Sequence, residues 1–213
     1  MKSFFHKYNY SIIKMFVTQF AISLFGATLA MATTLSKNDA LTIVVSVCAV
    51  LFYLFLLYVM TWEIGAKDRV AFDTGKMAYK PLTGIWLSLF ANIPNFIIAI
   101  AFTIGYPSMI TGAEWGSNIC GFMQVALFMV EGMYLGLLTV FELPVLGVMR
   151  QLNQIWWSYF IIILPAVLIC WLAYYLGHKN IRFTSLMVYK DPNQKRKNKI
   201  RNSITSQPWG DIF

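Results

Sequence analysis

Two asparagines flank a proline inside a long apolar run, and these residue types could support chemistry. Asn92, Pro94 and Asn95 lie near the middle of the run over residues 84–106. Proline has no backbone N–H and disturbs the preceding turn, so a carbonyl is freed where no water can bind it. Many transporters build a substrate or ion site at such a break. The alternative is a kinked helix whose asparagines bond to neighbouring helices.

Glu131 and Glu142 are the only acidic residues within the apolar runs. Carboxylates inside a membrane are costly, and they are candidates for carrying protons or binding cations. We expect Glu142, two residues before Pro144, to lie near mid-depth and to be the stronger candidate, whereas Glu131 equally fits a solvated turn. Gln124 adds hydrogen-bonding capacity. The hypothetical substrate or ion site therefore consists of Asn92, Pro94, Asn95, Glu142 and Gln124.

Patterns for catalysis or for metal binding are missing. The two histidines, His6 and His178, lie at the ends of apolar runs, and no HExxH, GxSxG or paired-aspartate pattern occurs. The cysteines, Cys48, Cys120 and Cys170, lack the spacing or the histidine neighbours of a metal site or a disulfide framework. We expect no enzymatic activity, no cofactor and no metal.

The composition places these residues in a membrane. Of the 213 residues, 58% are hydrophobic and only 12% are charged, whereas roughly a quarter of the residues of a soluble domain are charged. Spans of about 20 residues plus their loops allow about five or six crossings and no sizeable soluble domain. The sequence therefore predicts an all-α polytopic membrane protein.

The distribution of charge indicates how many times the chain crosses. Apolar runs cover residues 12–34, 40–61, 84–106, 119–149 and 155–177. Lys and Arg outnumber Asp and Glu by 17 to 9, and basic residues collect in cytoplasmic loops. They concentrate before the first run, in the segment 62–82 and after residue 178. An even number of crossings, with both termini cytoplasmic, keeps nearly all of them inside.

The fourth run is too long for one crossing and short for two. We expect it to split at Glu131–Gly132 into crossings over about residues 117–131 and 133–149. Each half is shorter than a hydrocarbon core of about 30 Å requires, so the hairpin must be thin, tilted or re-entrant, with its turn buried in protein. The prediction is about six transmembrane helices: four or five full spans plus a short or re-entrant helical hairpin.

The two ends of the chain carry separate predictions. The run that ends at Ala30-Met31-Ala32 fits an uncleaved first span, with a cleaved signal peptide as the alternative. The transmembrane domain covers residues 1–178, and residues 179–213 form a basic, largely disordered cytoplasmic tail. This tail either only fixes the topology or contacts anionic lipids. The candidate lipid contacts are Lys195, Arg196, Lys197, Lys199 and Arg201.

Small residues at helical spacing predict close helix packing, or docking of a partner subunit, at Gly26 and Ala30 and at Gly132 and Gly136. Without a nucleic-acid motif, the expected partners are the lipid bilayer and other membrane subunits. The favoured function is a small solute transporter, or a membrane subunit of a transport complex, in a bacterial cytoplasmic membrane. The alternative is a non-transporting scaffold or regulatory subunit that binds partners through helix and loop contacts.

Overall fold

The computed structural model describes residues 2–75, 78, 80–145 and 147–181. It is 82% helical, and its described part contains five helices long and apolar enough to cross a membrane. These are Phe4–Leu35, Asp39–Asp73, Ile93–Ile110, Glu114–Val140 and Ser158–His178. The chain is therefore an all-α membrane protein in its main architecture. The basic tail from residue 182 onward lies outside the described residues, and so do its five candidate lipid contacts.

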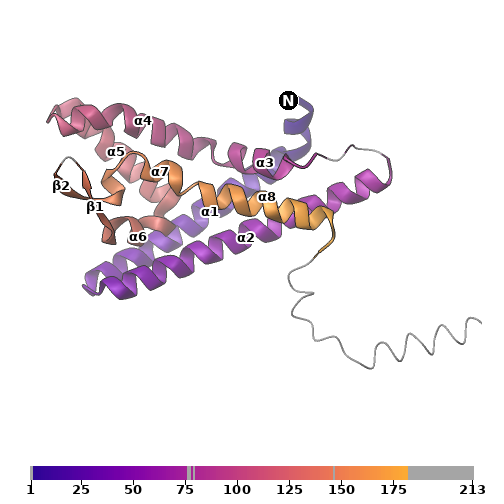
Figure 1. The fold of residues 1–213 in the computed structure, drawn as a ribbon, viewed down its shortest axis with the longest axis horizontal. Helices are drawn as coiled ribbons and strands as arrows, with labels where there is room; N and C mark the ends of the chain where they lie inside the picture. Colours follow the sequence, from indigo (N-terminus) through magenta and orange to yellow (C-terminus); the bar gives the residue numbers. More distant parts are fainter. Residues whose placement is uncertain (1, 76–77, 79, 146, 182–213) are drawn as a thin grey trace, which may run out of the picture. The chain divides into compact units, whose positions relative to one another are not determined.

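Two long helices run antiparallel and span the bundle (Figure 1). These are α1 (Lys2–Leu35) and α2 (Asp39–Asp73). Asn38 caps α2 by accepting a hydrogen bond from the backbone N–H of Leu41 at 3.2 Å, which satisfies one of the free donors of the first turn. With 35 residues, α2 rises about 52 Å, so it extends well beyond a hydrocarbon core of about 30 Å.

The third and the last apolar runs are each broken into two helices. The third run gives α3 (Thr83–Ala91) and α4 (Ile93–Ile110), and the last gives α7 (Ser158–Ile161) and α8 (Leu164–His178). In both, a proline occupies the first turn of the second helix, where its missing N–H costs least. The predicted interruption of the third run beside Pro94 is confirmed.

The fourth run enters the bundle and turns back. It consists of α5 (Glu114–Glu131), the 3₁₀ turn η1 (Gly132–Tyr134) and α6 (Leu135–Val140). α5 packs antiparallel to α4 and ends beside Asn95, because the side chains of Asn95 and Glu131 are hydrogen-bonded. From there α6 returns to Thr42 and Ser46 in the first turns of α2, which lie against Gly136. The break falls at the predicted point, and the segment turns back inside the bundle.

The second half of this run does not form the helical crossing over residues 133–149 that the sequence predicts. After α6 come the antiparallel strands β1 (Glu142–Val145) and β2 (Val148–Gln151), then the 3₁₀ turn η2 (Leu152–Gln154). Pro144 disfavours a continued helix, and Gly147 has the positive φ of 79° that the turn requires. Run length alone did not distinguish this hairpin from a buried helix.

The start of α1 and the end of α8 lie at the same end of the bundle. Lys7 of α1 and Tyr174 of α8 both bond to Asp68 near the end of α2. The α1–α2 turn, the α4–α5 turn and the β-hairpin lie at the other end (Figure 1). Within the described residues, four segments therefore traverse the bundle, namely α1, α2, α3 with α4, and α7 with α8, and the segment of α5, η1 and α6 turns back inside it.

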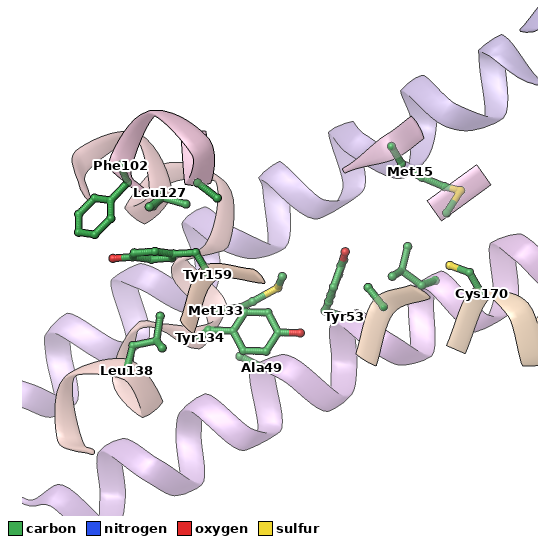
Figure 2. Packing of buried hydrophobic residues seen from close by; sticks show 14 of the residues in the cluster. Met15, Ala49, Tyr53, Phe102, Leu127, Met133, Tyr134, Leu138, Tyr159 and Cys170 are labelled. Atoms are coloured by element: carbon green, nitrogen blue, oxygen red, sulfur yellow. The ribbon is translucent and has the colours of Figure 1, made fainter. Parts of the chain in front are cut away.

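The core lies where the segment of α5, η1 and α6 meets the long helices. Figure 2 shows Met133 and Tyr134 of η1 packed among Tyr53, Leu138 and Tyr159. The predicted packing residues lie at close backbone contacts: a Cβ built on Gly26 would lie 2.6 Å from Met133 Cα, and one on Gly132 would lie 2.7 Å from Ala27 Cβ. Gly136 lies against Ser46 and Thr42, and Ala30 is fully buried.

Candidate functional site

The carboxyl group of Glu131 is buried in the middle of the bundle. The residue is 4% exposed and stands at the end of α5, where the helix breaks. Its Oε1 accepts hydrogen bonds from Gln19 Nε2 of α1, at 2.9 Å, and from Asn95 Nδ2 of α4. Both donors are neutral amides, and no described Lys, Arg or His forms a salt bridge with Glu131. The interpretation of Glu131 as a solvated turn residue is wrong.

A chain of polar side chains connects Glu131 to the break in the third run. Asn95 Nδ2 also donates to Asn92 Oδ1 at 2.7 Å, and Asn92 Nδ2 donates to the Ser88 carbonyl at 2.9 Å. Ser88, Asn92 and Asn95 are all buried. Because these residues come from α3, the break and α4, the interruption beside Pro94 aims Asn95 at the carboxylate. Asn95 Oδ1 is buried and has no hydrogen-bond partner among the described residues.

Close contact between η1 and α1 holds the carboxylate in place. The backbone N–H of Gly132, directly after α5, donates to Ser23 Oγ. Ser23 lies one helical turn after Gln19, so both side chains face the same partner. Gly132 has no side chain to separate the two segments. The position of Glu131 opposite Gln19 therefore follows from the glycine that comes next in the sequence.

A cavity of about 420 Å³ opens beside Glu131. Both hydrogen bonds to Glu131 fall on Oε1, and no described residue donates to Oε2. Three other lining residues are bonded to one another: Gln124 Nε2 and the Tyr159 hydroxyl donate to the backbone carbonyl of Asn153, whose Oδ1 is buried without a described partner. The cavity is lined by Met31, Gly121, Gln124, Val125, Leu127, Phe128, Glu131, Gly132, Leu135, Leu138, Asn153 and Tyr159.

The structure brings together part of the hypothetical site. Asn92 and Asn95 meet at the break that Pro94 produces, and Gln124 lines the cavity on the same helix as Glu131. Glu142 does not join them, because it is exposed on strand β1 and not at mid-depth in a helix. The expectation that Glu142 is the stronger carboxylate is therefore corrected in favour of Glu131.

The sequence carried a usable signal for Glu131 but not for its partner Gln19. Glu131 follows Gln124 by seven residues, a spacing that places both on one face of a helix, and it directly precedes a glycine that permits a break. Gln19 is a polar residue within the first apolar run, but nothing in the sequence says which helix it faces.

Among the described residues, no group of three or more His, Cys, Asp or Glu side chains could hold a metal ion. No protein-family model, no curated protein and no solved structure matches the chain. The arrangement around Glu131 is therefore the basis for a functional proposal.

Proposed function

We propose that this protein is a small solute transporter, or the membrane subunit of a transport complex, and that its solute site is the cavity beside Glu131. The observation that carries the proposal is a buried carboxylate beside a cavity of about 420 Å³, with one oxygen, Oε2, that receives no hydrogen bond from a described residue. Ionisable groups are expensive among apolar helices, and they mark solute or ion pathways in membrane proteins.

The broken helices support the same proposal. The C-terminal end of α5 and the N-terminal turn of α4 meet at the bond between Glu131 and Asn95. Half-helix ends that meet inside the bilayer are a recurrent way to build a transport site, because their unpaired backbone groups and dipoles act on charged solutes.

The scaffold alternative draws less support from the helix faces. It requires small-residue faces that point outward to a partner. Gly26, Ala30, Gly132 and Gly136 instead pack against other described segments of this chain or are fully buried.

Transport through this site predicts that Glu131→Gln abolishes solute movement. The purified protein is reconstituted in liposomes, and currents on a solid-supported membrane are recorded after concentration jumps of protons, alkali cations, amines and amino acids. We expect at least one of these solutes to give a current in the wild type and the variant to reduce it at least 10-fold. Glu142→Gln is the matched control, because Glu142 is exposed and outside the cavity; its currents should equal those of the wild type.

Two results would contradict transport. One is a folded wild-type protein that gives no current with any of these solutes. The other is a Glu131→Gln variant that gives the wild-type current. Circular dichroism and gel filtration establish in each case that the variant is folded.

The proposed orientation places both termini in the cytoplasm of a bacterial cell, with the β-hairpin outside. In a Cys48→Ala background, Met149→Cys, which is exposed on β2, should react with a membrane-impermeant maleimide added to whole cells. Asp73→Cys at the end of α2 should react only after the cells are opened. The reverse pattern would show that the orientation is inverted.

A further inference from the structure

We infer that the cavity beside Glu131 binds a small organic monocation: a primary amine with an apolar body, whose ammonium group pairs with the carboxylate. This inference deepens the proposed function and rests on it for the role of the bound molecule. The charge, the hydrogen-bond polarity and the walls of the cavity each favour this class of substrate.

The charge of the site is that of one carboxylate. Among the described residues that line the cavity, Glu131 is the one carboxylic acid, and none is Lys, Arg or His. Glu131 also forms no salt bridge within the described part of the chain. A lone carboxyl group in apolar surroundings is ionised at least cost beside a ligand with a single positive charge, because each charge removes the cost of burying the other.

The hydrogen-bond polarity of the site is that of an acceptor. Glu131 Oε2 receives no hydrogen bond from a described residue, and Asn153 Oδ1 is buried without a described donor. An ammonium group has three donors and no acceptor, so it matches acceptor oxygens that lack a described donor.

The walls favour a carbon body over a bare metal ion. Apart from its few polar groups, the cavity is lined by Met31, Val125, Leu127, Phe128, Leu135 and Leu138. Its volume of about 420 Å³ lies within the roughly 300 to 1,000 Å³ of small-molecule sites. A hard metal cation needs about six oxygen ligands around it, which these walls do not supply. The ring of Phe128 can pack against an apolar group or a cation.

Benzylamine and benzyl alcohol form a matched pair of probes, because they share the apolar ring and differ in charge. Binding of each to the purified protein in lipid nanodiscs is measured by isothermal titration calorimetry at neutral pH. We expect benzylamine to bind at least 10-fold more tightly than benzyl alcohol. Glu131→Gln should remove that difference, and Glu142→Gln should leave it intact.

A second variant tests the site without changing its carboxylate. Asn153→Leu removes the unpartnered Oδ1 but keeps the backbone carbonyl that Gln124 and Tyr159 bond. We expect it to weaken benzylamine binding about 3-fold to 10-fold and to leave benzyl alcohol unaffected. It keeps the inference testable should Glu131→Gln fail to fold.

Equal affinity for the two probes, no binding of either, or full benzylamine affinity in both variants would overturn the inference. Should benzylamine not bind while another solute gives currents that depend on Glu131, the substrate class is wrong and the transport proposal stands. Should benzylamine bind at Glu131 while no solute gives a current, the site stands and the transport proposal fails.

Discussion

Replacing Asp68 by alanine is expected to lower the free energy of unfolding by about 2 to 6 kcal/mol, because two buried tyrosine hydroxyls lose a hydrogen-bond acceptor and each such loss costs about 1 to 3 kcal/mol. Asp68 is 4% exposed. It accepts hydrogen bonds from Lys7 Nζ and from the Tyr8 hydroxyl, both at 2.6 Å, and from the Tyr174 hydroxyl at 3.0 Å. These bonds connect α1, α2 and α8 at the end of the bundle where α1 begins and α2 and α8 end.

The size of the effect follows from what the variant leaves behind. Tyr8 and Tyr174 are buried, so their hydroxyls cannot exchange Asp68 for bulk water, and a buried hydroxyl that loses its acceptor costs about 1 to 3 kcal/mol. Asp68→Asn keeps an oxygen acceptor but loses the charge. We expect its stability to lie between that of the wild type and that of the alanine variant.

The measurement is thermal unfolding in mild detergent, followed by intrinsic tryptophan fluorescence. Asp73→Ala is the matched control on the same helix, because Asp73 forms an exposed ion pair with Arg69 at 3.5 Å, and such pairs contribute about 0 to 1 kcal/mol. Equal losses of stability in the two alanine variants would refute the structural role of Asp68.

Asp68 also shows where the sequence stops being informative. The segment 62–82 reads as a charged cytoplasmic segment, and nothing in it separates the buried Asp68 from the exposed Asp73. The difference depends on Lys7 and Tyr174, which are 61 and 106 residues away. Local patterns predict the all-α fold class and the break at Pro94, because both depend on residues near one another in the chain.

The candidate site was half predictable for the same reason. Asn92, Asn95 and Gln124 stand out as polar residues in apolar runs, and the structure places them around one carboxylate. The choice between Glu131 and Glu142 depended on whether residues 142–151 form a helix or a hairpin. An apolar run interrupted by proline and glycine permits both, so the tertiary path decided which acid is buried.

The last expected result concerns the close contact between Gly26 of α1 and Met133 of η1. Gly26→Ala should destabilise the protein by about 1 to 3 kcal/mol, the usual cost of overpacking a core. The new Cβ would lie 2.6 Å from Met133 Cα and 3.2 Å from the Met133 backbone N. Because backbone cannot rotate away as a side chain can, α1 and η1 must separate. Gly121→Ala is the control, since a Cβ there meets nothing within 4 Å, and alanine in a helix should stabilise it slightly.

Thermal unfolding of the two variants should therefore show shifts of opposite sign, and binding distinguishes a local clash from a coupled one. Gly26 does not line the cavity, but Met133 lies two residues after Glu131, whose partner Gln19 is on α1. Separation of η1 from α1 would lengthen the bond between Glu131 and Gln19 and lower benzylamine affinity in the folded Gly26→Ala variant. Unchanged affinity together with lost stability would mean that the contact supports the bundle without positioning the carboxylate.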